Sequence, residues 1–151
     1  ARKVFFDIKG FNVDTHMDEF GCSVGEELLK IHKSYFNSIY PNIKPCGIKG
    51  LAHLTGGGFV DNIPRILPEG TAIEIDCTSW DVPPVFSYIQ NEGGVDAEEM
   101  YRAFNMGVGM AAVVSPENEK KLIAALKEKG DEAFRAGIVT DGDRRVTLNG
   151  I

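Results

Sequence analysis

The spacing of hydrophobic residues changes along the chain, and each spacing predicts a different element. Hydrophobic residues recur at helical intervals over 26–39, which predicts a helix. Short apolar runs predict strands over 48–54, 72–76 and 108–115. The last of these runs is almost continuously apolar, which is typical of a strand buried on both faces.

Capping and turn residues predict further helices. Asp96 and Glu99 have the spacing of a capping box, and Ser115 before Pro116 is a strong signal for a helix N-terminus. Four more helices are therefore expected: 62–67 behind Asp61, 85–90 behind Pro83 and Pro84, 97–104 behind Asp96, and one from Pro116 to a stop at Gly130.

The C-terminal part of the chain predicts a hairpin. Strands are expected over 134–140 and 144–148, joined by a turn at Asp141-Gly142-Asp143. Helices and strands are thus mixed along the whole chain. The most economical architecture is α/β (α+β), with a single mixed sheet and helices packed on it, in one domain.

Composition and charge narrow the classes of protein. The chain has 151 residues, 43% of them hydrophobic, which suits one domain with an exposed surface of about 7,500 Å². Its formal charge of −6 argues against a nucleic-acid partner, and no apolar run is long enough to predict a membrane span. Three widely spaced cysteines form no zinc motif, so we expect reduced thiols, no metal site and a cytoplasmic protein.

The most informative segment joins a strand to three consecutive glycines. The turn after that strand consists of Thr55, Gly56, Gly57 and Gly58. Glycine amides can approach an anion closely, and successive amides can form an anion-binding nest. Arg65 supplies a fork for a phosphate or a carboxylate, and His53 and Asn62 flank the turn. A flexible turn without a ligand explains the three glycines equally well.

A second segment follows the helix expected over 97–104. Asn105, Met106 and Gly107 stand between that helix and the next strand, where a helix C-cap and close packing are a sufficient structural explanation. The position of His53 suits a proton-transfer group or a hydrogen-bonded strand residue equally well. Trp80 is more typical of a core residue and His32 of a surface residue.

These segments together resemble a known family. The resemblance rests on His53-Leu54-Thr55-Gly56-Gly57-Gly58, Asn62-Ile63-Pro64-Arg65, Trp80 with Pro83-Pro84-Val85-Phe86, and Glu99-Met100-Tyr101-x-x-Phe104-Asn105-Met106-Gly107-x-Gly109-Met110. Their order and spacing are similar to those in the C-terminal half of the phosphoribosylformylglycinamidine cyclo-ligases, or AIR synthetases, of purine biosynthesis. The similarity extends over residues 2 to about 139.

The resemblance implies a fold, a reaction and a site. Residues 1–151 would form a loosely ferredoxin-like C-terminal domain without the family's N-terminal ATP-binding domain. The family uses ATP and Mg²⁺, held mainly by that other domain, to activate the formamide oxygen of formylglycinamidine ribonucleotide, and an amidine nitrogen then closes the imidazole ring. By resemblance, the candidate catalytic residue is His53, and the candidate phosphate- and substrate-binding residues are Thr55, Gly56, Gly57, Gly58, Asn62, Arg65, Asn105, Met106 and Gly107.

The resemblance also implies partners, and this sequence departs from the family pattern at one place. The partners would be a phosphorylated small-molecule substrate, the protein's own N-terminal domain and, in the full-length form, a second copy in a homodimer. The abrupt start is expected of a fragment, which would be inactive alone. Ile31 and His32 stand where the family usually has Pro and Thr, which indicates a divergent branch. A stand-alone module that binds a phosphorylated metabolite, the corresponding domain of a related ATP-dependent enzyme, and a partner-docking domain remain alternatives.

Overall fold

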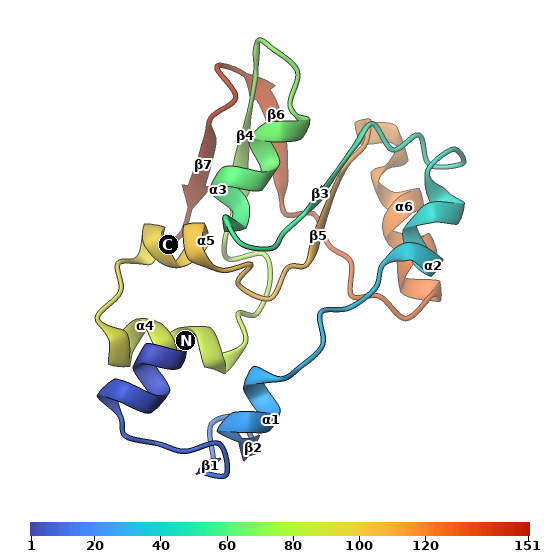
Figure 1. The fold of residues 1–151 in the computed structure, drawn as a ribbon. Coiled ribbons are helices and arrows are strands. Elements are labelled where there is room, and N and C mark those ends of the chain that lie inside the picture. The colour runs from blue at the N-terminus through green and yellow to red at the C-terminus, as the bar shows by residue number, and fades with distance from the viewer.

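The computed structural model describes all 151 residues and places helices around three small sheets (Figure 1). The strands are β1 (His16–Met17), β2 (Cys22–Ser23), β3 (Gly50–His53), β4 (Thr71–Asp76), β5 (Met110–Val113), β6 (Gly137–Asp141) and β7 (Val146–Asn149). The sheets are β1-β2, β3-β5 and β6-β4-β7. The predicted mixed α/β class is confirmed, but three sheets replace the single one expected. Because β6 and β7 occupy both edges of β4, the β3-β5 pair has no edge of β4 to join.

The two C-terminal strands are present, but the predicted hairpin between them is wrong. β4 lies between them and pairs antiparallel with β6 and parallel with β7. The connecting residues cross the end of β4, where the Gly142 N–H donates to the Gly70 carbonyl over 3.0 Å. An Asp-Gly turn signals only that the chain reverses locally, so it does not reveal that an earlier strand separates the two arms.

Three of the predicted helices begin at or near their predicted N-terminal signals. They are α1 (Val24–Leu28), α2 (Phe36–Ile39), α3 (Gly58–Asn62), α4 (Pro84–Gly93), α5 (Ala97–Ala103) and α6 (Pro116–Glu128), with a π-helix η1 (Lys3–Ile8) and 3₁₀ turns η2 (Tyr40–Asn42) and η3 (Ile63–Ile66). The helices predicted as α4, α5 and α6 are confirmed. The capping box predicted for Asp96 and Glu99 is wrong, because Glu99 does not accept from the Asp96 N–H, and Ser115 precedes α6 without a side-chain capping bond. The helix expected over 62–67 is wrong, because α3 ends at Asn62 and the 3₁₀ turn η3 follows it. Asp61 lies in the first turn of α3 and caps neither element. Asp96 caps α5 by accepting from the Glu98 N–H over 3.0 Å.

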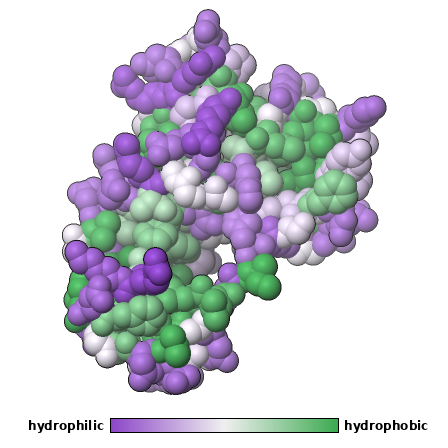
Figure 2. All heavy atoms as spheres, in the orientation of Figure 1, coloured by the Kyte–Doolittle hydropathy of each residue, from purple (hydrophilic) through white to green (hydrophobic).

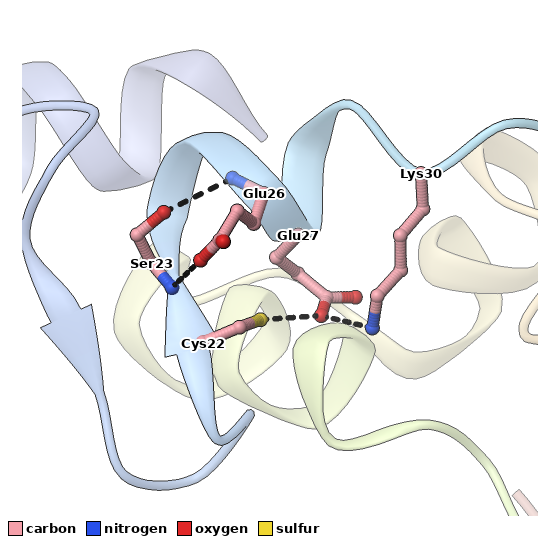
Figure 3. Close-up of polar contacts among 5 residues, drawn as sticks. All are labelled: Cys22, Ser23, Glu26, Glu27 and Lys30. Atoms are coloured by element: carbon pink, nitrogen blue, oxygen red, sulfur yellow. Dashed lines mark hydrogen bonds and ion pairs between the residues drawn. The ribbon is translucent and has the colours of Figure 1, made fainter.

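The single helix predicted over 26–39 is wrong, because α1 ends at Leu28 and α2 begins at Phe36. A capping box starts α1, with the Ser23 hydroxyl accepting from the Glu26 N–H over 3.2 Å and the Glu26 carboxylate accepting from the Ser23 N–H over 2.8 Å (Figure 3). Between α1 and α2 the chain has no regular structure, and we call residues 29–35 the strap. Hydrophobic residues in the strap lack the buried face that helical spacing predicts: Leu29 is 80% exposed and Ile31 95%.

The last turn of α1 carries a small polar cluster. The Glu27 carboxylate accepts from the Lys30 ammonium over 2.5 Å and from the Cys22 thiol over 3.6 Å (Figure 3). Burial, more than the neighbouring carboxylate, raises the pKa of the Cys22 thiol. The thiol is therefore held in its protonated form, and the cluster fixes the end of α1 where the strap begins.

A core of sixteen buried residues joins α1, α3, α4 and α5 to strands of all three sheets. Its largest fully buried members are Phe5, Phe59, Leu54, Ile63, Met100 and Val24. The chain nevertheless exposes 9100 Å², against about 7,500 Å² for a compact protein of this mass. The excess reflects an open arrangement, in which β3 and β5 reach away from the α4 and α5 region toward α6 and α2 (Figure 1). None of the helices combines the length and apolarity needed to cross a bilayer.

Candidate functional site

The glycine loop, which we define as residues 55–58, follows the C-terminal end of β3. The residue after β3, Leu54, is fully buried, and its N–H donates to the Gly109 carbonyl over 3.0 Å. This bond extends the pairing of β3 with the β5 side and fixes where the loop begins. Within the loop, the Gly58 N–H donates to the Thr55 carbonyl over 2.9 Å and closes a turn.

Two glycines of the loop are required by its shape. Gly57 and Gly58 have φ values of +95° and +50°, the left-handed region that disfavours other residues. Gly58 also lies directly against the C-terminal end of α5, and a Cβ there would overlap the backbone carbonyls of Tyr101 and Phe104. Gly56 differs from both, because it has open space around it and no positive φ.

Three consecutive backbone amides of the loop have no acceptor in the protein. The N–H groups of Thr55, Gly56 and Gly57 make no backbone hydrogen bond, and no side chain accepts from them. Thr55 and Gly56 are exposed, and so is the Thr55 hydroxyl, which also lacks a partner. The loop therefore presents adjacent donors to solvent, which is the arrangement that holds an anion.

Asn62 maintains the shape of the loop from beneath. Its side chain is buried, and its amide donates to the Gly58 carbonyl over 2.8 Å and to the Gly56 carbonyl over 3.2 Å. Both amide protons are used inside the protein. A direct contact between Asn62 and a ligand stays a prediction, while its role in shaping the loop is visible in these bonds.

The second predicted segment lies beside the first as a turn over residues 105–107. The Asn105 side chain accepts from the Gly107 N–H over 3.1 Å, and Met106 has a left-handed φ of 49°. The Trp80 indole N–H donates to the Met106 carbonyl over 3.0 Å. Its ring stacks on Phe59 at 5.6 Å between centroids, so the core position predicted for Trp80 is confirmed.

The structure brings the two predicted segments together, and it shows no polar contact between Arg65 and either of them. The contact of Gly58 with α5 places the glycine loop next to the 105–107 turn. Arg65 lies on η3, is exposed, and forms no hydrogen bond or ion pair with any site residue. Its predicted contact with an anion stays a prediction.

His53 contacts His32, a residue that the sequence pattern predicts to lie on the surface. Its Nε2 lies 2.8 Å from the Nε2 of His32, with the ring centroids 4.6 Å apart at 77°. His32 belongs to the strap, and both imidazoles are exposed. The one sequence signal for this pair is the departure at Ile31 and His32 from the family pattern.

Two more contacts fix the strap near the site. The Lys33 ammonium forms an ion pair with the buried carboxylate of Asp131, next to the end of α6. Burial acts to raise the pKa of that carboxyl, but hydrogen bonding to Lys33 and Ser38 and the Lys33 charge together outweigh it and hold the pKa below its ordinary value. Further along, the Tyr35 side chain packs directly against Gly109, and burial raises the pKa of this phenol.

A hydrophobic cavity of about 530 Å³ lies on another side of the β3-β5 pair. It runs between α6 and the β4-β6 side of the three-stranded sheet, and neither the glycine loop nor His53 lines it. No group of three or more His, Cys, Asp or Glu side chains in the chain is placed to hold a metal ion. The groups that this site offers for chemistry are the free N–H groups of the glycine loop and the His32–His53 imidazole pair.

Comparison with known families gives a match over nearly the whole chain. Residues 5–149 match the family described as "AIR synthase related protein, C-terminal domain". The chain belongs to this family. The AIR synthase resemblance predicted from the glycine loop and the 105–107 turn is thereby confirmed.

Two similar curated relatives carry the same enzyme name. The chain is similar to the phosphoribosylformylglycinamidine cyclo-ligase of Alkaliphilus oremlandii, with 41% identity over 148 residues, 98% of this chain and 43% of the relative. It is also similar to the enzyme of the same name from Brevibacillus brevis, with 40% identity over 151 residues. The aligned region is 100% of this chain and 44% of that relative. The chain thus spans less than half the length of the curated relatives it matches.

Proposed function

We propose that this chain is the C-terminal domain of an ATP-dependent phosphoribosylformylglycinamidine cyclo-ligase and that its glycine loop holds a phosphate group. The observation that carries the proposal is the row of three unpaired amides at Thr55, Gly56 and Gly57. Successive backbone donors in a turn with left-handed glycines favour an anion. The relatives named as cyclo-ligases support the choice of reaction.

The residues on this chain supply binding, orientation and proton transfer. The loop amides would hold the phosphate end of the substrate, and the rigid turn over residues 105–107 would limit its position. His53, at the end of β3, would exchange a proton with the amidine or formamide group as the ring closes. Fixed donors and a positioned proton carrier lower a barrier because they are already oriented when charge develops.

ATP and Mg²⁺ belong to the proposed reaction, but this domain offers no fitting site for the metal. The chain has no cluster of three or more metal-ligating side chains. We therefore derive no step through ATP or Mg²⁺ on this chain. In the whole protein they would supply the phosphoryl group that activates the formamide oxygen, and the N-terminal part would hold them.

An exposed hydrophobic strip supports an N-terminal partner domain. Leu29, Ile31, Phe36 and Tyr40 lie in the strap, α2 and η2 and are between 63% and 95% exposed. Figure 2 shows hydrophobic atoms projecting from the connection between α1 and α2 without cover. Such a patch marks an interaction surface, and relatives more than twice as long as this chain supply a domain to cover it. The homodimer and the cytoplasmic location stay predictions.

A chimera tests the proposed activity. It joins the N-terminal part of the Alkaliphilus oremlandii relative to this chain, and the assay follows ring closure that depends on both ATP and formylglycinamidine ribonucleotide. Gly56→Asp places a carboxylate among the free amides without a steric clash, and Gly56→Asn is its uncharged control. We expect kcat/KM to fall at least about tenfold in the Asp variant compared with the Asn variant, because like charges repel.

The alternatives predict other results. A folded chimera without ring closure would contradict the cyclo-ligase activity. If phosphate still bound to that chimera, a stand-alone binding module would be the better description. Equal kcat/KM in the Asp and Asn variants would contradict the role of the glycine loop.

A further inference from the structure

We propose that His32 is a positioning residue for His53, which fixes the orientation and the tautomer of the His53 imidazole. This inference rests on the proposed function, because it assigns a purpose to the candidate proton carrier of that site. Its starting point is the 2.8 Å contact between the two Nε2 atoms. No other polar side chain forms a hydrogen bond with either imidazole.

The contact constrains where the protons lie. A hydrogen bond between two imidazole nitrogens needs one N–H donor and one unprotonated acceptor. In the neutral pair, one histidine therefore carries its proton on Nε2 and the other on Nδ1. The tautomer of His53 is therefore tied to that of His32, and in either arrangement the His53 Nδ1 is the ring nitrogen left to meet the substrate. Without a partner, an exposed imidazole would rotate and exchange tautomers freely.

The strap is anchored well enough to hold His32 in place. The residue after His32 is Lys33, whose ion pair with buried Asp131 ties the strap to the end of α6. Tyr35 packs against Gly109 just before β5, and its ring lies 6.0 Å from the His32 ring in an edge-on arrangement. His32 thus projects from a segment fixed to two other elements, although the segment has no regular structure of its own.

The strap also connects the site to the proposed domain interface. Ile31, immediately before His32, is 95% exposed and belongs to the hydrophobic strip. A domain that covers Ile31 would press on the segment that carries His32. The same short segment therefore contacts the candidate proton carrier on one side and offers a docking residue on the other.

Nuclear magnetic resonance of the chain tests the pairing directly. Long-range ¹⁵N–¹H spectra of the histidine rings at pH 8, where an unperturbed imidazole is neutral, distinguish the two tautomers. We expect His53 and His32 to show opposite tautomers in the wild-type chain, and the tautomer ratio of His53 to change in His32→Ala. His16→Ala is the matched control, because His16 is exposed and its ion-pair partner is Asp18, away from His53. A His53 tautomer unchanged by His32→Ala would overturn the proposal.

The chimera tests whether positioning affects the reaction. We expect His32→Ala to lower kcat about tenfold with little change in KM, because a misplaced proton carrier weakens the transition state more than substrate binding. His32→Gln keeps a side-chain amide for the hydrogen bond and is expected to recover most of kcat. A kcat unchanged in His32→Ala would refute positioning for catalysis. A wild-type chimera without ring closure would refute the proposed function instead, and the tautomer measurement would still decide the pairing.

Discussion

Replacing Gly58 with alanine is expected to destabilise the domain by about 2–5 kcal/mol. The left-handed backbone at Gly58 costs an L-residue about 1–2 kcal/mol. The added Cβ would overlap the carbonyls of Tyr101 and Phe104, and such overpacking costs about 1–3 kcal/mol. Carbonyls at the end of α5 are backbone atoms and cannot rotate away as a side chain would, so both costs apply.

Urea unfolding followed by circular dichroism measures this loss. For a chain of this length the loss corresponds to a fall in Tm of about 6–15 °C. Gly56→Ala is the matched control, because Gly56 has open space and no positive φ, and its stability is expected to stay the same or rise by about 0.4–1 kcal/mol. Equal unfolding midpoints for the wild type, Gly56→Ala and Gly58→Ala would refute the packing of the glycine loop against α5.

Three further predictions concern the surroundings of the site. Trp80→Phe keeps an aromatic ring but removes the N–H donor to Met106, and urea unfolding is expected to show a loss of about 0.5–1.5 kcal/mol. Ile31→Ser is expected to change the stability of the chain by less than about 0.5 kcal/mol, while calorimetry shows weaker association with the N-terminal part of a relative. Lys33→Ala is expected to be less stable than the wild type at neutral pH, with a difference that shrinks as the pH falls below about 4.

The sign of the last prediction follows from Asp131. Its folded-state pKa lies below the ordinary value, so its pairing with Lys33 stabilises the fold above that ordinary value. The contribution disappears as acid protonates the carboxyl in the folded chain. A difference between wild type and Lys33→Ala that stays constant from pH 7 to pH 2 would argue against the ion pair. Unchanged association of Ile31→Ser would exclude this residue from the interface, and an unchanged midpoint for Trp80→Phe would exclude the indole bond.

Local signals in the sequence predict where helices, strands and turns lie better than they predict which strands pair. Asp96 and Ser115-Pro116 marked helix starts correctly, because a cap acts on the residues next to it. The turn after β6 was also recognised as a turn. Its strands were paired wrongly because β4, which separates them, lies far earlier in the chain. Register and strand order depend on such distant contacts, which a local pattern does not contain.

Distant contacts also determine the conformation of the strap, which a local sequence pattern does not predict. Hydrophobic spacing over 26–39 predicts a helix with one buried face, yet Leu29 and Ile31 are exposed. The strap is held instead by contacts to His53 and Asp131, which come from distant parts of the chain. The glycine loop was predictable because glycine itself signals unusual backbone geometry. The structure added which amides stay free and which residue faces His53.

The central claim is that the free amides of the glycine loop bind a phosphate group. The most direct test titrates the ¹⁵N-labelled chain with inorganic phosphate at constant ionic strength and follows the amide resonances. We expect saturable shifts concentrated at Thr55, Gly56 and Gly57. The phosphate affinity obtained from them is expected to be retained in Gly56→Asn and to fall at least about tenfold in Gly56→Asp. Shifts that do not saturate, or that are the same in both variants, would contradict this claim.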